Sequence, residues 1–173
     1  MIIELARLRL RPFRSADVDA VVAGLNDWAV AQWVISPPYP YRHEDFQRYA
    51  QMVGDDHANE CPLQFAVARR ASDELVGSVG VALKPGRIGE LGYWFSRSHW
   101  GQGFATEASL AVIAQAMRHR DVSRLFATID PQNEPSRRVL AKIGFVYARE
   151  YLRDEPTRRG TFRSWVYEFP SDI

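Results

Sequence analysis

The chain has little of what covalent cross-links and structural metal sites require. Its 173 residues include one cysteine, Cys61, and four histidines. A lone cysteine cannot form a disulfide within the chain, and no Cys and His residues are spaced as zinc ligands are. We therefore expect no metal and a reducing compartment, by default the cytoplasm.

Long apolar runs and an excess of charge of one sign are also missing. No apolar stretch reaches the roughly 18 residues that a membrane-spanning helix needs, and the first residues lack the apolar core of a signal peptide. Twenty-two Lys and Arg against 21 Asp and Glu leave a net charge of +1, which gives no argument for nucleic acid. We expect no membrane and no nucleic-acid partner, so an anionic ligand must be bound by a local site.

What is present is the composition of a globular protein. Hydrophobic residues make up 46% and aromatic residues 12%, which excludes the disordered and fibrous classes. The length suits one hydrophobic core and is short for two. We therefore expect one domain over residues 1–173, acting as a monomer or a homodimer.

The hydrophobic pattern predicts helices, then an antiparallel meander, then alternating helices and strands. Residues 5–11 alternate apolar and basic side chains, as a half-buried strand does, and Ser15 is the expected N-cap of the first helix. The expected helices cover about 16–25, 26–34, 44–53, 104–118 and 134–143, and the further strands about 63–70, 74–84, 87–96, 124–129, 145–151 and 161–169. This order predicts an α+β fold: a mixed, mostly antiparallel twisted sheet of about seven strands flanked by helices.

The stretch HWGQGFATEA, residues 99–108, places two glycines where an apolar helix begins. Glycine is unfavourable inside a helix and favourable in a turn. One interpretation is that Gly101 and Gly103 only form a tight turn between a strand and a helix. The helix is apolar on two sides, one with Ala108 and Val112 and the other with Leu110 and Met117, and we expect it to be buried. Its free N–H groups and positive dipole end would then face outward and suit an anion.

A dinucleotide-binding fingerprint is a second interpretation of the same glycines. Gly101, Gly103 and Thr106 approximate G-x-G-x-x-G, and Asp130 follows at a spacing near that of a ribose-binding acid. A dinucleotide-binding fold, however, needs consecutive β-α-β units. Here an antiparallel meander precedes the glycines and only two helix–strand units follow them, so the context argues against this interpretation.

A third interpretation comes from two motifs together. The run WGQGFATEA resembles the Q/R-x-x-G-x-G/A loop of the GNAT superfamily of acetyltransferases, and NEPSRRVLAKIGF, residues 133–145, resembles its Asn-x-x-Ser segment and the helix that follows. Trp100 stands where Gln or Arg is usual, a variant typical of the ribosomal-protein N-acetyltransferase (Rim) branch. The resemblance covers about residues 5–169. It implies the GNAT acyl-CoA N-acyltransferase fold, with acetyl-CoA as co-substrate and an amine as acceptor.

The resemblance also implies which residues bind acetyl-CoA. Backbone N–H groups of residues 102–106 would hold the pyrophosphate, the strand end at 95–97 and Asn133 would hold the pantetheine arm, and Arg138 would meet the 3′-phosphate. The implied residues are Phe95, Ser96, Arg97, Gln102, Gly103, Phe104, Ala105, Thr106, Asn133 and Arg138. Asn133 is also placed to cap the next helix, and both roles are compatible.

Acetyl transfer from a thioester needs a neutral amine, a stabilised oxyanion and a protonated leaving thiolate. In the strand GELGYWFS, Glu90 shares a face with Gly92, Trp94 and Ser96. Glu90 is either a solvated or ion-paired carboxylate or, as its likeness to the acid of the Rim branch implies, the base that takes a proton from the attacking ammonium, directly or through water. Gly92 indicates a bulge or the close approach of a ligand.

The usual acid for the leaving thiolate is absent. Many members of the superfamily carry a Tyr seven residues after the motif Asn, and Leu140 occupies that position here. Ser136 shares a helix face with Leu140 and Ile143, so its hydroxyl needs a partner. That partner is either the helix backbone or, as the Rim branch implies, the sulfur of CoA. The departure at Leu140 keeps a second function open, a non-catalytic acyl-CoA-binding regulatory or sensing module.

Aromatic side chains gather before the meander, in the region that covers the acceptor side of the cleft in this family. Trp28, Trp33, Tyr39 and Tyr41 are either core packing or a wall for an amine, and Trp33 and Tyr39 are the predicted substrate-binding residues. The Rim resemblance implies a protein N-terminus as acceptor. Similar sequences also acetylate small amines and antibiotics, so the residues leave the acceptor open.

Overall fold

One sheet organises the residues that this computed structural model describes, which are 1–58, 63–119 and 122–170; Cys61 lies outside them. Within these ranges the sheet has eight strands in the order β1-β2-β3-β4-β5-β6-β8-β7. The strands are β1 (Ile3–Glu4), β2 (Leu8–Arg11), β3 (Gln64–Arg69), β4 (Leu75–Lys84), β5 (Ile88–Phe95), β6 (Arg124–Ile129), β7 (Val146–Leu152) and β8 (Arg163–Phe169). Only the β5–β6 pair is parallel among these strands, which confirms the predicted mixed, mostly antiparallel sheet.

The sheet has one strand more than predicted because the first residues fold back on themselves. The predicted strand over 5–11 forms only from Leu8, because residues 5–7 make a turn in which the Leu5 N–H donates to the Leu8 carbonyl oxygen at 2.9 Å. β1 lies before the predicted range and pairs antiparallel with β2, with Ile3 opposite Leu10. The apolar and basic alternation therefore predicted strand structure correctly but gave no signal for the turn inside it.

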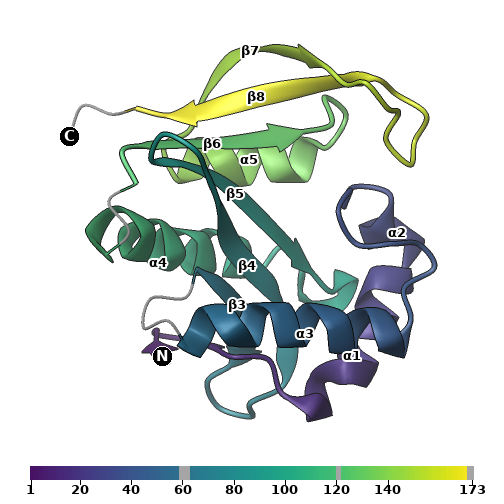
Figure 1. Cartoon of the computed structure of the whole chain (residues 1–173), viewed down its shortest axis with the longest axis vertical. Helices are drawn as coiled ribbons and strands as arrows, with labels where there is room; N and C mark the ends of the chain where they lie inside the picture. The colour runs from purple at the N-terminus through teal and green to yellow at the C-terminus, as the bar shows by residue number, and fades with distance from the viewer. Residues whose placement is uncertain (59–62, 120–121, 171–173) are drawn as a thin grey trace.

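Five α-helices among the described residues pack on the two faces of the sheet (Figure 1). They are α1 (Val18–Asn26), α2 (Trp28–Ala31), α3 (His43–Ala58), α4 (Phe104–His119) and α5 (Glu134–Lys142). Ser15 is not the N-cap of α1, because it begins a short 3₁₀ turn, Ser15–Asp17, that precedes the helix. Helix α2 is much shorter than the predicted 26–34 and begins after Asp27, whose carboxylate accepts from the Ala29 N–H at 2.9 Å.

Two hydrophobic cores hold these layers together. Alternation along β3 sends Phe65 and Val67 into the larger core, which contains the buried face of α4 and residues of α5. Ala66 points the other way, into a smaller core with residues of α1 and α3. On the second apolar side of helix α4, Ile113 is buried, but Leu110 is 48% and Met117 44% exposed. The prediction that both apolar sides of this helix are buried is therefore wrong.

The strands β5 and β6 run side by side only briefly, and this positions the site. They pair from Ile88 opposite Arg124 to Glu90 opposite Phe126. Beyond these residues β5 stays paired with β4, while β6 stays paired with β8, so the two strands separate. In Figure 1, β5 runs down and away from β6, β8 and β7. Such a separation exposes the edge of β5 inside the sheet.

A buried ion-pair network joins the start of α1 to the turn between β3 and β4. Arg11 is 1% exposed, and its guanidinium contacts both carboxylate oxygens of Asp17, at 2.7 and 2.8 Å. Its Nε donates to Asp73 at 3.1 Å, and Arg9 and Arg14 also pair with Asp73. Burial alone would raise the pKa of Asp73, but the hydrogen bond and charge of Arg11, with the other arginines, hold that pKa below its ordinary value.

Candidate active site

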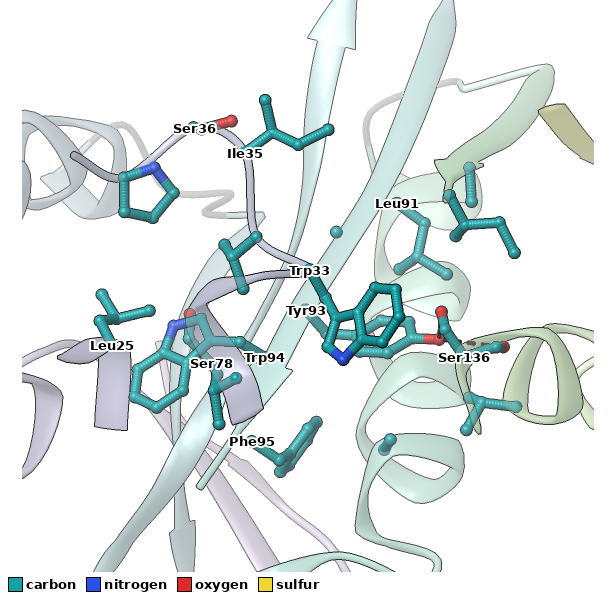
Figure 2. Close-up of a pocket in the computed structure, with 18 of the residues that line it drawn as sticks. Leu25, Trp33, Ile35, Ser36, Ser78, Leu91, Tyr93, Trp94, Phe95 and Ser136 are labelled. Carbon is teal, nitrogen blue, oxygen red and sulfur yellow. Dashed lines mark hydrogen bonds between the residues drawn. The ribbon is translucent and has the colours of Figure 1, made fainter. Parts of the chain in front are cut away.

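A cleft of about 1380 Å³ opens where β5 and β6 part. It is lined by residues 90–95 of β5, by residues 127–130 at the end of β6, by the first turns of α4 and α5, and by the segment 32–38 that follows α2. Figure 2 shows Trp94 on one side of β5 and Tyr93 with Ser136 on the other. The open edge of β5 therefore gives access to side chains from both faces of the sheet.

The glycine turn forms one end of this cleft. Gly101 and Gly103 have φ angles of 74° and 77°, a left-handed conformation that favours glycine. The first main-chain bond of α4 runs from the Glu107 N–H to the Gly103 carbonyl at 3.1 Å, which leaves the N–H groups of residues 103–106 without a partner inside the helix. Because these residues line the cleft, the positive end of α4 faces it.

Arg7, directly before β2, holds the outer side of the turn. Its Nη1 donates to the Gln102 carbonyl at 2.7 Å and its Nε to a Glu107 carboxylate oxygen at 2.8 Å. The carbonyl and N–H of a trans peptide point in opposite directions, so this bond turns the Gly103 N–H away from Arg7. Sequence reasoning missed Arg7 because 95 residues separate it from Gln102, and an exposed basic residue in a strand carries no signal for such a partner.

The predicted cofactor-binding residues do not all lie in the cleft. Phe95, Gly103, Phe104, Ala105, Thr106, Asn133 and Arg138 line it. Ser96 and Arg97 instead line a shallow hollow beside α1, and Gln102 lies on the outer side of the turn with its carbonyl bound to Arg7. Trp100 fastens the turn to β5, because its indole N–H donates to the Phe95 carbonyl at 2.7 Å.

Glu90 lies on the wall that faces α3. Its carboxylate is 32% exposed and pairs with Lys84 Nζ at 3.1 Å, so the ion-paired state is the one observed. Gly92, two residues along the same face, pairs regularly with Gly80, so of the two alternatives the bulge is wrong and the close approach of a ligand stays a prediction. A Cβ atom placed on Gly92 would meet nothing within 4 Å. The absence of a side chain at Gly92 thus leaves open space beside Glu90.

Ser136 faces Glu90's strand from the first turn of α5. Its hydroxyl lies 2.8 Å from the phenol oxygen of Tyr93, which also reaches the Ser136 carbonyl at 3.4 Å. The Ser136 hydroxyl is therefore bound to β5 rather than to its own helix backbone. Asn133 caps the helix as predicted, since its Oδ1 accepts from the Ser136 N–H at 3.2 Å. Leu140 is fully buried below it.

Tyr93 was not among the predicted site residues. Desolvation raises the pKa of its phenol to about 12, although the hydrogen bond with Ser136 acts in the opposite direction. Alternation places Tyr93 between the apolar Leu91 and Phe95 on the face opposite Glu90. A buried phenol needs a polar partner. A tyrosine on an otherwise apolar strand face was therefore the signal in the sequence that a polar group lies opposite it.

The far end of the cleft is formed by the segment after α2. Trp33 lines the cleft, and the guanidinium of Arg159 lies 4.4 Å from its ring centre. Arg158 fixes this segment by donating to the carbonyls of Ala31 and Val34 at 2.8 and 2.6 Å. Tyr39 is 46% exposed and lies outside the cleft lining.

Tyr39 contacts another aromatic residue rather than the cleft, because its ring lies 5.5 Å from that of Trp28. Tyr41 is buried in the smaller core. Of the four aromatic residues considered from the sequence, Trp33 and Tyr41 reach the cleft, and Trp28 and Tyr39 do not.

Neither a metal centre nor a membrane-spanning helix is found among residues 1–58, 63–119 and 122–170. Among those residues, no group of three or more His, Cys, Asp or Glu side chains is arranged to hold a metal ion. None of the helices described is both long and apolar enough to cross a membrane.

A family model and a curated relative that match this chain are both described as acetyltransferases. A family model described as an acetyltransferase (GNAT) domain matches residues 7–146. A curated relative from Bacillus licheniformis, named uncharacterized N-acetyltransferase p20, is 28% identical over 157 residues, which cover 89% of this chain and 86% of the relative.

Solved structures share the same architecture. A GNAT-family acetyltransferase from Bacillus anthracis has a TM-score of 0.83 at 25% identity, covering 100% of both chains. RimL, described as a ribosomal L7/L12 alpha-N-protein acetyltransferase in complex with coenzyme A, has a TM-score of 0.81 at 20% identity, covering 99% of this chain and 100% of its own. At that identity the likeness to RimL concerns the fold alone.

Proposed function

The chain belongs to the GNAT family of acetyltransferases, and from that premise we propose that it moves an acetyl group from acetyl-CoA to a primary amine by direct attack. The observation that carries the proposal is the cleft at the parting of β5 and β6. The positive end of α4 faces one end of it, and Glu90 and Ser136 line it between that end and Trp33. We further propose that residues 1–173 act as one acetyltransferase domain of the Rim branch.

The donor would bind along the α4 and α5 side of the cleft. Unpaired N–H groups of residues 103–106 suit the pyrophosphate, and the Asn133 amide and Phe95 lie where the pantetheine arm would pass. Arg138, paired with Glu134 at 3.5 Å and largely exposed, is available to the 3′-phosphate. Contacts of Ser96, Arg97 and Gln102 with the cofactor stay predictions, since these three lie outside the cleft lining.

Glu90 would act as the base. The amine nitrogen attacks the thioester carbonyl carbon, a C–N bond forms, and collapse of the tetrahedral species breaks the C–S bond with the electron pair leaving on sulfur. The proton released by the attacking nitrogen passes to Glu90, directly or through a water molecule. The open space beside Gly92 lies on the same wall and gives the amine its approach.

Ser136 would stabilise the leaving thiolate, with Tyr93 as its positioning residue. A phenol whose pKa is about 12 stays neutral and donates to the Ser136 oxygen. The hydroxyl hydrogen of Ser136 is then free to point at the sulfur. Because an ordinary thiol has a pKa of about 8.5, neither hydroxyl gives up its proton fully, and the pair stabilises the thiolate by a hydrogen bond.

Thiol release from acetyl-CoA tests this function, measured with a panel of peptide N-termini, polyamines and aminoglycosides. We expect turnover with at least one amine, and a loss of roughly tenfold or more in kcat for Glu90→Gln and for Ser136→Ala, with CoA binding retained. Glu150→Gln is the matched control, since this carboxylate lies on β7, outside the cleft, in an ion pair with Arg163. CoA binding without turnover of any amine would contradict the proposal.

A further inference from the structure

The acceptor end of the cleft presents apolar side chains to solvent. Ile35 is 39% and Met52 is 61% exposed, and both line the cleft. Ile35 comes from the loop after α2, which crosses β5 in Figure 2, and Met52 comes from α3. Large apolar side chains exposed in a concave site are typical of a surface that contacts a ligand.

These side chains belong to the same side of the sheet as Glu90. Helix α3 packs on the face that receives Ala66 and Trp94, and Glu90 shares that face with Trp94 by strand alternation. Ala82, directly opposite Glu90 on β4, is exposed and also lines the cleft. An amine that reaches Glu90 from this side therefore passes apolar groups.

Each carboxylate of the cleft has a basic partner within the protein, although the buried Oδ2 of Asp130 makes no hydrogen bond within the part of the chain that the structure describes. Asp45 contacts the guanidinium of Arg48, Glu90 pairs with Lys84 at 3.1 Å, and Asp130 lies 3.6 Å from Arg159.

The charges that line the cleft do not favour a cation either. They comprise three acidic residues, Asp45, Glu90 and Asp130, against four basic ones, Arg48, Arg138, Lys142 and Arg153; without Arg138, which is assigned to the donor phosphate, the two signs balance. A site that recognised a polyamine or an aminoglycoside would need unpaired negative charge to replace the water around each additional ammonium.

We infer that the acceptor carries a neutral, apolar group beside its primary amine and no further cation. The inference rests on the proposed function and narrows it. An N-terminal residue with an apolar side chain and a free apolar amine share this chemistry, and the assay separates them by comparing Leu-initiated and Lys-initiated peptides with leucinamide, lysinamide and spermidine.

Turnover and binding are measured separately. We expect kcat/KM for the leucine acceptor to exceed that for the lysine acceptor by about tenfold or more, as burial of one apolar side chain supports. Calorimetric titration of leucinamide and lysinamide into the CoA-bound protein reports the same preference without turnover. If neither amine is acetylated but leucinamide still binds more tightly, the proposed function fails while the preference stands.

Charge substitutions at Met52 test the site itself. Met52→Lys is expected to raise KM for the leucine acceptor roughly tenfold while KM for acetyl-CoA stays unchanged, and Met52→Glu to improve the lysine acceptor. Met117→Lys is the matched control, because Met117 is 44% exposed on α4 and lies outside the cleft lining. Spermidine or lysinamide as the better ligand, or equal effects at Met52 and Met117, would overturn the inference.

Discussion

The phenol of Tyr93 lies 2.8 Å from the hydroxyl of Ser136 and joins β5 to the first turn of α5. Residues from two walls of the cleft are thereby held at a fixed separation. In the proposed reaction this contact decides where the Ser136 hydrogen points, since a hydroxyl that accepts from Tyr93 keeps its own hydrogen for the sulfur.

Tyr93→Phe removes this contact with little change in shape. We expect kcat to fall roughly threefold to tenfold, which corresponds to the net free energy of one hydrogen bond. The KM for acetyl-CoA should not change. Steady-state kinetics check this against Tyr147→Phe on β7, where the ring packs on Trp165 outside the cleft.

The double variant separates positioning from packing. Tyr93→Phe combined with Ser136→Ala should be no slower than Ser136→Ala alone, because Tyr93 acts through Ser136. Additive losses would mean that Tyr93 acts independently. The pKa of about 12 also predicts that no ionisation of Tyr93 affects kcat below about pH 10.

Gly103→Val tests the turn at the head of α4. A β-branched residue at a φ of 77° is strained, at a cost of about 1–2 kcal/mol, and its Cβ would lie 3.4 Å from Nη2 of Arg7, the residue that holds the Gln102 carbonyl. We expect the Kd for CoA to rise at least about tenfold beyond what the loss of stability explains. Gly160→Val is the control, since Gly160 has a φ of 79° and lies outside the cleft lining. Equal losses of CoA binding in both variants would show that Gly103 only forms a tight turn and has no specific role in binding CoA.

Much of this turn was predictable because its signals are local. The two glycines and the start of α4 lie within a few residues, and so do Asn133 and the helix that it caps. The partner of Ser136 was not predictable, because alternation assigns Tyr93 to a face but does not say that Ser136, 43 positions later in the chain, returns to meet it. For a related reason composition gathers aromatic residues in a segment without telling which of them points inward: Tyr39 lies outside the cleft lining, and its role in binding the substrate stays a prediction.

Arg7→Met tests whether the outer side of the turn matters for the donor. Loss of the bond to the Gln102 carbonyl should loosen the peptide that carries the Gly103 N–H, and we expect roughly a threefold to tenfold higher Kd for CoA. The KM for the amine should not change. Arg163→Met, which replaces an exposed ion-paired arginine on β8, is the control in a calorimetric titration with CoA. If Arg7→Met leaves the Kd for CoA unchanged, the turn keeps its shape without Arg7.

Acid stability should depend on Asp73. Its pKa is lowered in the folded chain, so its ionised form contributes stability that is present above the unfolded pKa of about 3.9 and lost as the pH falls through the lower folded value. Asp73→Asn is expected to be less stable at pH 7 and to lose less additional stability between about pH 5 and pH 2. Urea unfolding at each pH measures this, and parallel pH profiles for the two proteins would contradict it.

The most direct test of the account is the appearance of product. Acetyl-CoA and leucinamide are incubated with the protein, free thiol is measured, and the acetylated amine is identified by mass spectrometry. The account predicts thiol and N-acetylated amine in equal amounts, both nearly abolished in Glu90→Gln while CoA still binds. Bound CoA with no amine-dependent thiol release, for leucinamide or any other amine of the panel, would contradict it.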